Sequence, residues 1–401
     1  MNPTILRAAL VLGLLSAIGP FAIDMYLPAL PAIGASLGAD TAGVQASLMA
    51  FMAAIAVCQL FYGPVSDMVG RKPPLYFGLA LFTAGGIACA LAPSIEWLVV
   101  ARFVQGIGAC AAMALPRAIV RDGYTGADAA QLQSLLMLVF SVSPILAPLG
   151  GSLIVQFGDW RVIFYAVAGI GLLGILLVAF FLKETRPASA RLESSVGSAI
   201  KGYGVLLRDR NFLGLSMIGA FGMASFMAYL ANSSFILIDH YGLNPTQYSI
   251  MFSINAVSFI GVSQLTGVLT RRYGLNAVVR TAVNGFILVM VALAAVFALG
   301  VDRLDVLAAL LFVGYGFLGL VIPTTAVLAL EEHGAIAGTA SALMGTLQLV
   351  TAAVVMGIVG SFFDGTARPM VLGIAACAII AFALTRLTIK RSRAPLAAAA
   401  E

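Results

Sequence analysis

Two charged residues lie inside long apolar runs and are the side chains best placed to do chemistry within a membrane. Asp24 lies in segment 23–28 (IDMYLP), and Arg102 lies in segment 101–108 (ARFVQGIG). A charge at the centre of a bilayer costs about 2.5–3.5 kcal/mol on insertion scales, and such residues usually face a polar cavity. Desolvation favours the neutral form of a carboxyl group, so Asp24 could bind and release a proton. We therefore expect Asp24 to carry a proton; the alternative is a structural charge pair.

The elements that must position these charges are membrane-spanning helices. Hydrophobic residues make up 61% of the 401 residues and charged residues only 10%, too few charges for a soluble surface of this size. A span needs roughly 20 apolar residues. The sequence predicts an all-α membrane protein with twelve spans in two bundles of six helices. The spans are expected at 8–31, 44–65, 74–92, 97–117, 130–156, 162–183, 211–238, 245–269, 277–299, 304–330, 337–360 and 368–389.

Local features give the depth of the two buried charges. Pro20, Pro28 and Pro31 surround Asp24 and should break or kink the first span, which frees carbonyl groups to line a cavity. Asp24 lies about 7 residues, or roughly 10 Å, from the outer end of its span. Arg102 lies about 5 residues, or roughly 8 Å, from the outer end of the fourth span. A direct or water-mediated pairing of the two side chains is consistent with these depths.

A short charged turn joins the second and third spans. Segment 63–75 (GPVSDMVGRKPPL) places Asp67 at the end of one helix and Arg71 and Lys72 at the start of the next. Gly63 and Gly70 allow a tight turn. Segment 267–274 (GVLTRRYG) aligns with 63–70 without a gap, which indicates an internal duplication. For the basic pair alone, the alternative is a solvated loop that obeys the positive-inside rule.

These motifs resemble those of a known family. The turn is similar to the Gly-x-x-x-Asp-x-x-Gly-Arg-Lys signature of the major facilitator superfamily, in which the acid and the basic pair latch the two halves together. Gln105, Gly106 and Gly108 follow Arg102 as in the family's fourth-span motif for proton coupling. Segment 143–151 (SPILAPLGG) resembles its antiporter signature, with Ala147 in place of a glycine. The residues of this motif are Pro144, Pro148, Gly150 and Gly151.

Together with the first span, these motifs resemble the Bcr/CflA branch of drug-resistance transporters. This resemblance implies a major facilitator fold and export of drugs such as bicyclomycin or chloramphenicol in exchange for protons. The proton would be the coupling ion and no cofactor is expected. Alternatives within the same fold are a proton-coupled metabolite exporter and an uptake symporter. A membrane enzyme is disfavoured because no cluster of His, Cys and carboxylate residues is found, and a sensor would need a soluble output domain.

The basic residues predict the topology. With a cytoplasmic N-terminus, eighteen of the 22 Lys and Arg residues fall on the cytoplasmic side, three on the other side, and Arg102 within a span. We expect both termini in the cytoplasm and the chain in a bacterial inner membrane. The predicted units are a first bundle at 1–183, a cytoplasmic loop at 184–210, a second bundle at 211–389 and a tail at 390–401. The pattern does not explain the acidic cytoplasmic loop 331–333 (EEH).

Polar, aromatic and Met side chains within the spans are candidates for substrate binding, because they adapt to varied apolar ligands. They are Tyr26, Gln45, Met49, Gln105, Met113, Phe140, Phe226, Tyr229, Asn232, Asn255 and Gln348. For each residue alone, the alternative is ordinary helix packing. The four cysteines have no partners at ligand spacing, so neither a disulfide nor a metal is expected. The expected partners are a small drug-like molecule and the lipid bilayer, with no nucleic acid, and the chain should be a monomer.

Overall fold

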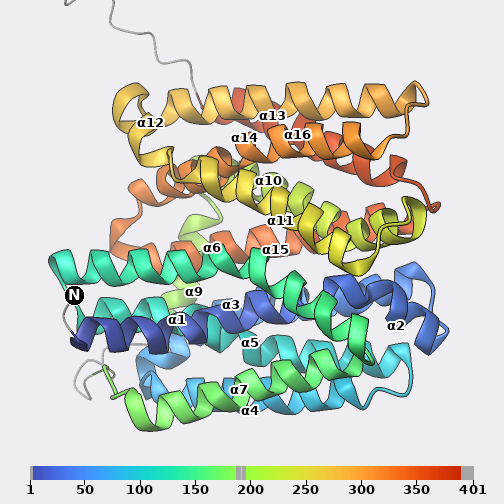
Figure 1. The fold of residues 1–401 in the computed structure, drawn as a ribbon. Coiled ribbons are helices and arrows are strands. Elements are labelled where there is room, and N and C mark those ends of the chain that lie inside the picture. Colours follow the sequence, from blue (N-terminus) through green and yellow to red (C-terminus); the bar gives the residue numbers. More distant parts are fainter. Residues whose placement is uncertain (1–2, 187–190, 192–195, 390–401) are drawn as a thin grey trace, which may run out of the picture.

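The chain folds into twelve long antiparallel helical spans, which confirms the predicted fold class (Figure 1). The computed structural model describes residues 3–186, 191 and 196–389. Within these residues, twelve helices are long and apolar enough to cross a membrane. The first span comprises α1 (Pro3–Asp24), the turn η1 (Leu27–Ala29) and α2 (Leu30–Leu37). Spans two to six are α3 (Thr41–Val69), α4 (Lys72–Ala90), α5 (Ile95–Gly123), α6 (Gly126–Phe157) and α7 (Arg161–Phe181).

The second half repeats this arrangement after a short helix, α9 (Val196–Leu206). Its first span is α10 (Arg210–Ser234), which continues as the π-helix η2 (Phe235–His240). The next is α11 (Pro245–Ser263) with α12 (Thr266–Tyr273). The remaining spans are α13 (Leu275–Ala298), α14 (Leu304–Glu331), α15 (Ala337–Ser361), which follows the turn η3 (Gly334–Ile336), and α16 (Arg368–Thr388). The predicted tail 390–401 and residues 187–190 and 192–195 of the predicted loop lie outside the described residues.

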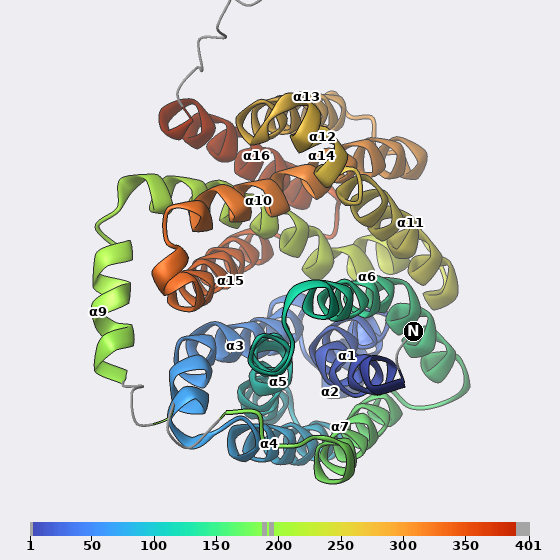
Figure 2. The same cartoon turned by 90° about the vertical axis from the view of Figure 1, so that its left-hand side faces the viewer.

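The helices form two bundles that face each other (Figure 2). Helices α1–α7 pack among themselves, as do α10–α16. The most extensive contacts between the bundles are those of α3 with α15 and of α6 with α11. The described connections at 70–71, 124–125, 182–186, 207–209, 274 and 332–336 lie at the end of the molecule where the chain begins, which we call the terminal face. The opposite face carries the connections at 38–40, 91–94, 158–160, 241–244, 299–303 and 362–367.

The first span is broken where the prolines predicted a break. Helix α1 ends at Asp24, and the chain passes through η1 before it continues as α2. Pro28 lies in η1, and Pro31 lies in the first turn of α2. Backbone N–H groups in a first helical turn have no acceptor within the helix, so proline costs no hydrogen bond there. This span reaches Leu37 instead of the predicted residue 31, because the chain resumes a helix after the break.

The fourth span is also longer than predicted. Helix α5 runs to Gly123, whereas the end of the apolar run predicted residue 117. Hydrophobicity marks the part of a helix that lies in hydrocarbon, but the backbone hydrogen bonds continue beyond it. The charged residues Arg117 and Arg121 are therefore part of the helix at the terminal face.

Hydrogen bonds between Gln45 and Gln59 of α3 and the second bundle join the two bundles. Near the opposite face, Gln45 donates to the Asn232 side chain at 2.9 Å and to the Ala231 carbonyl at 3.2 Å. Nearer the terminal face, Gln59 donates to the Ala342 carbonyl at 3.0 Å. The small helix α9 covers the edge of this seam (Figure 2), where the Tyr203 hydroxyl donates to the Leu60 carbonyl of α3 at 2.9 Å. Because α9 also packs on α15, it contacts both bundles.

Candidate transport site between the two bundles

Asp24 lies at the break of the first span, in the interior of the protein. Only 5% of its surface is exposed. Within the described residues its carboxylate forms no ion pair. It lies close enough to Tyr248 of α11 to interact electrostatically, and that tyrosine shares a hydrogen bond with Ser233 of α10 at 3.1 Å. The only deeply buried acid predicted from the sequence is thus placed beside the second bundle, where a change in its charge can affect contacts between the bundles.

Arg102 is enclosed by aromatic rings. It is fully buried, and its guanidinium carbon lies 4.1 Å from the ring centre of Phe51, 4.8 Å from that of Tyr26 and 5.8 Å from that of Phe164. The negative faces of such rings stabilise a cation, more strongly when water is excluded. Nη1 donates to Gln105 Oε1 at 2.7 Å and to the Ala22 carbonyl at 3.2 Å. Nε and Nη2 are buried without a hydrogen-bond partner.

The structure brings Arg102 close to the Asp24 segment but shows no direct pair, and because the first span runs on to Leu37, Asp24 lies deeper than the predicted distance of about 7 residues from the outer end. The contact of Arg102 with Ala22 places the guanidinium two residues along the chain from Asp24. No ion pair joins Arg102 to Asp24 in this conformation. The guanidinium of Arg102 instead contacts the aromatic rings and the Ala22 carbonyl, which the helix break leaves without its usual helical partner. Arg102 therefore contacts the backbone of the segment that ends at Asp24, just before the helix break.

The fifth-span motif packs directly against this break. A Cβ atom on Gly151 would lie 2.0 Å from the Met25 carbonyl oxygen, so only glycine fits there. A Cβ on Gly150 would meet only the end of the Met25 side chain, at 3.9 Å. The same helix also faces the second bundle, because the carbonyl groups of Pro148 and Ile145 accept hydrogen bonds from serines of α11. The motif therefore touches both the Asp24 segment and the opposite bundle.

The predicted substrate residues fall into separate groups. Gln45 and Asn232 meet across the seam between the bundles. Met49 of α3 lies 3.0 Å from the position that a Cβ on Gly357 of α15 would take. The side chain of Tyr26 is buried and hydrogen-bonded to Ser47 in the first bundle. Gln105 is buried beside Arg102, as described above.

In the second bundle, Phe226 and Tyr229 form an aromatic cluster with residues of α11 and α14. The Asn255 amide donates to the Tyr229 hydroxyl at 3.0 Å. The Gln348 amide lies 3.2 Å from the position that a Cβ on Gly219 would take. Met113 packs on Gly19 within the first bundle. The side chain of Phe140 lies outside the described part of the structure.

Sequence reasoning missed several residues of α11. Tyr248 is fully buried and within electrostatic range of Asp24, and Ser249 and Ser253 donate to the motif carbonyls at 2.9 and 3.3 Å. The two serines lie four residues apart and so share one face of the helix, which is a pattern that could have marked them. Tyr248 gives no such signal, because the residue it interacts with electrostatically, Asp24, lies more than two hundred positions away in the chain.

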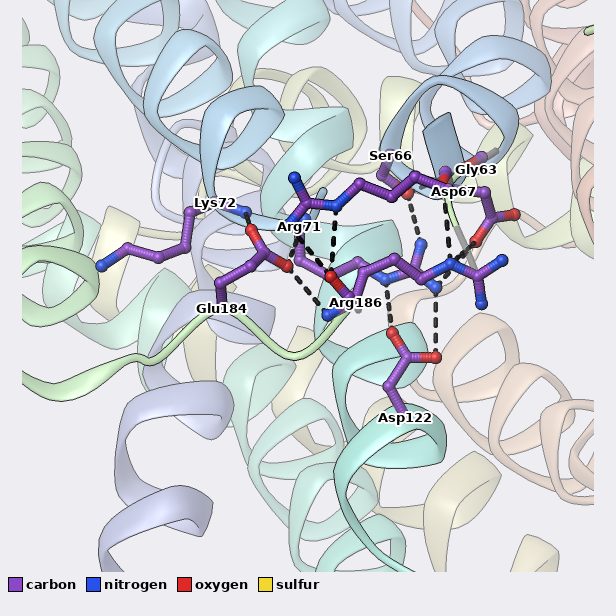
Figure 3. A network of polar contacts seen from close by, with 9 residues as sticks. Gly63, Ser66, Asp67, Arg71, Lys72, Asp122, Glu184 and Arg186 are labelled. Atoms are coloured by element: carbon purple, nitrogen blue, oxygen red, sulfur yellow. Dashed lines mark hydrogen bonds and ion pairs between the residues drawn. The ribbon is translucent and has the colours of Figure 1, made fainter. Parts of the chain in front are cut away.

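The predicted charged turn forms a dense network at the terminal face (Figure 3). Arg71 is 1% exposed, and its guanidinium contacts Asp67 at 2.7 Å and Asp122 at 2.6 Å. The Glu184 carboxylate accepts hydrogen bonds from the backbone N–H groups of Arg71 and Lys72, at 2.9 and 3.0 Å. Lys72 Nζ donates to the Leu182 carbonyl at 2.9 Å. The turn residues were predictable from their motif, but Asp122 and Glu184 were not, because their spacing from the turn gives no local signal.

The network lies within the first bundle and the segment that follows it. Arg186 joins it through a 3.4 Å hydrogen bond to the Asp67 carbonyl and a 4.0 Å contact with the Asp67 carboxylate. Burial alone would raise the pKa of Glu184, but the backbone N–H groups of Arg71, Arg186 and Lys72 outweigh it and hold that pKa below its usual 4.5. In this conformation the predicted latch residues tie α3, α4 and α5 together, and their contact with the second bundle stays a prediction.

The second copy of the turn has the same backbone shape. Gly70 ends its helix at φ 101° and ψ 169°, and Gly274 ends α12 at φ 81° and ψ 153°. Both values of φ lie in the region that favours glycine. Arg271 stands where the first copy has Asp67, and it donates to the Gly267 carbonyl at 3.0 Å. The duplication therefore extends to local geometry, while the acid of the network is present in the first copy only.

Two helical bundles that face each other, with a broken helix at their interface, are typical of a secondary transporter. The chain belongs to the Major Facilitator Superfamily, whose sequence profile matches residues 12–356. It is 39% identical over 376 residues to the MFS-type transporter YdgK of Bacillus subtilis, covering 92% of both chains. It is 30% identical over 382 residues to the bicyclomycin resistance protein homolog of Haemophilus influenzae, covering 92% of this chain and 93% of that protein.

Further similarities agree with this assignment. The chain is 32% identical over 244 residues to the multidrug resistance protein MdtL of Klebsiella pneumoniae, which covers 61% of this chain and 62% of that protein. The expected resemblance to the Bcr/CflA drug-resistance branch is thereby confirmed. Among solved structures, a D-xylose–proton symporter matches with a TM-score of 0.74 at 16% identity, covering 96% of this chain and 98% of that one. At such identity the match shows the fold alone.

Proposed function

We propose that this protein is a proton-coupled antiporter that exports small, largely apolar compounds similar to chloramphenicol or bicyclomycin. The observation that carries the proposal is the position of Asp24. It is a buried acid at a helix break, between a glycine-packed motif of its own bundle and a tyrosine of the other bundle. The names of the bicyclomycin-resistance and multidrug-resistance relatives support drugs as the substrate class.

The surroundings of Asp24 suit a group that changes charge during a transport cycle. A buried carboxylate with no ion-pair partner is costly in apolar surroundings, so protonation is favoured in a closed site. Arg102 cannot be neutralised in the same way, because a guanidinium keeps its proton in proteins. In the proposed cycle, Asp24 therefore binds the proton, and Arg102 supplies a fixed positive charge that favours the ionised carboxylate when the site opens.

Export would follow from a rocking motion of the two bundles about the site. At the opposite face, η1 packs against α10 and α11, and α2 packs against η2. Release of substrate at that face requires these contacts to open. We propose that the terminal face is cytoplasmic, that the membrane is the bacterial inner membrane and that the protein acts as a monomer. The distribution of Lys and Arg supports this orientation.

The test is transport by the purified protein in proteoliposomes. Radiolabelled chloramphenicol and a pH-sensitive dye inside the vesicles would report drug and proton movement together. We expect drug movement against its gradient when a proton gradient is imposed, with protons moving in the opposite direction. Movement of drug and protons in the same direction would instead identify an uptake symporter. No movement of either in a correctly inserted protein, over a panel of apolar drugs, would overturn the proposal.

A matched control separates the role of Asp24 from a general effect of charge. Glu332 is exposed at the terminal face and forms no ion pair among the described residues. We expect Glu332→Gln to transport like the wild type, whereas Asp24→Asn loses proton-driven accumulation. Equal loss in both variants would show that the assay reports overall charge or stability instead of proton coupling.

A further inference from the structure

A cavity of about 470 Å³ opens at the terminal face, between the end of α5 and the start of α6. Its lining residues are Arg117, Val120, Arg121, Tyr124, Thr125, Ala129 and Gln133. The cavity is separate from the transport site. Arg117 lies 15 residues along α5 from Arg102, which is roughly 22 Å at 1.5 Å per residue. The proposed transport reaction does not use these residues.

The two arginines of this cavity have no acidic partner. Neither forms an ion pair with any residue that the structure describes. Asp122, the acid next to Arg121 in the chain, is already bound to Arg71 at 2.6 Å. Asp128 lies in the first turn of α6 but is exposed and does not line the cavity. The cavity therefore carries two unneutralised positive charges.

The remaining lining groups add hydrogen-bond donors. Arg117 and Arg121 are four residues apart, so both side chains lie on one face of α5. The lining residues Tyr124, Thr125 and Gln133 carry hydroxyl and amide groups that can donate hydrogen bonds. Arg121 Nη1 also lies 3.7 Å from the position that a Cβ on Gly338 would take, in the first turn of α15. The positive end of that helix thus adds to the potential near Arg121.

We propose that this cavity is a binding site for a phosphate group. Arginine suits phosphate because its planar guanidinium donates two parallel hydrogen bonds to phosphate oxygens. Two arginines match the charge of a dianion, and the hydroxyl and amide groups can donate to its remaining oxygen atoms. The phosphate could belong to a free anion of the cell interior or to the headgroup of an anionic phospholipid, since the cavity opens at the face where headgroups would lie.

The first arm of the test measures free phosphate. Full-length protein in nanodiscs of phosphatidylcholine alone would be dialysed against radiolabelled inorganic phosphate, at constant ionic strength set with chloride. We expect saturable binding of one phosphate per chain. Loss of one charge-assisted contact in Arg117→Gln or Arg121→Gln should weaken binding by about tenfold. The control is Arg208→Gln, which removes an exposed arginine of the same face and should bind like the wild type.

The second arm tests the lipid headgroup. Protein purified from membranes that contain phosphatidylglycerol would be analysed by native mass spectrometry. If the headgroup is the occupant, the wild type and Arg208→Gln retain phosphatidylglycerol, the two cavity variants lose it, and the lipid competes with inorganic phosphate in nanodiscs. Saturable binding in either arm that depends on Arg117 and Arg121 supports the site. Absence of binding in both arms, or equal binding by all variants, would overturn it while leaving the proposed transport function unaffected.

Discussion

Replacing Gly151 with alanine should disable transport, whereas the same change at Gly150 should be tolerated. The two glycines are adjacent in one helix and chemically identical, but they have different neighbours. A Cβ at position 151 would lie 2.0 Å from the Met25 carbonyl oxygen, and ordinary contact begins at 3.4 Å. Helix α6 and the Asp24 segment would therefore have to separate by about 1.4 Å. At position 150 the nearest atom is Met25 Cε at 3.9 Å, which leaves room for a methyl group.

The magnitude follows from the cost of overpacking. Inserting a methylene into a well-packed core costs about 1–3 kcal/mol. At 1.4 kcal/mol per tenfold, the conformation in which the helices touch would become about 5–140-fold less populated. We expect the transport rate of Gly151→Ala to be lower than that of the wild type by a factor within this range. The rate of Gly150→Ala should stay close to that of the wild type.

The assay is drug transport in everted vesicles, with expression and insertion measured for both variants. Uncoupled proton flow through Gly151→Ala, read from the collapse of a pH gradient without drug, would show whether the displaced carbonyl also loosens the proton site. Equal transport by the two variants, or a larger loss in Gly150→Ala, would refute the reasoning.

Three further predictions concern contacts on either side of the site. Asp67→Asn should insert normally but transport less, because Arg71 loses its 2.7 Å ion pair; unchanged transport at equal expression would contradict this. Glu184 has a lowered pKa, so its stabilising contribution is present at neutral pH and is lost as the pH falls through and below 4.5. The thermal unfolding temperature of Glu184→Gln should therefore depend less on acidic pH than that of the wild type. Gln45→Ala removes hydrogen bonds between the bundles worth about 1 kcal/mol, so distances between spin labels at the opposite face should show a larger open population.

Much of the fold could be predicted from the sequence because membrane helices follow a local rule. An apolar run of sufficient length must form a helix, since its backbone has no other hydrogen-bond partners in lipid. The same rule explained the break at Asp24, where proline removes backbone donors. It could not predict that α5 continues to Gly123, because the helix outlasts its apolar part.

The site was predictable only in part. Asp24 and Arg102 stand out because a charge in an apolar run is rare, and the structure buries both, with Arg102 in contact with the segment that ends at Asp24. The residues that contact them could not be predicted from the sequence. The aromatic rings around Arg102 come from three different spans, and Tyr248 and Glu184 meet their neighbours across long stretches of chain. Such contacts depend on how helices pack, which single-residue chemistry does not determine.

The central claim is that Asp24 carries the proton that drives export. One charge moving through 100 mV is worth about 2.3 kcal/mol, which supports a substrate gradient of roughly 40-fold per proton. Asp24→Asn fixes a neutral side chain of the same shape, so it should bind drug and exchange it downhill but fail to concentrate it. The measurement is drug accumulation in proteoliposomes with an imposed proton gradient, comparing the wild type with Asp24→Asn. We predict accumulation by the wild type alone; a gradient built by the Asn variant and abolished by a protonophore would contradict the claim.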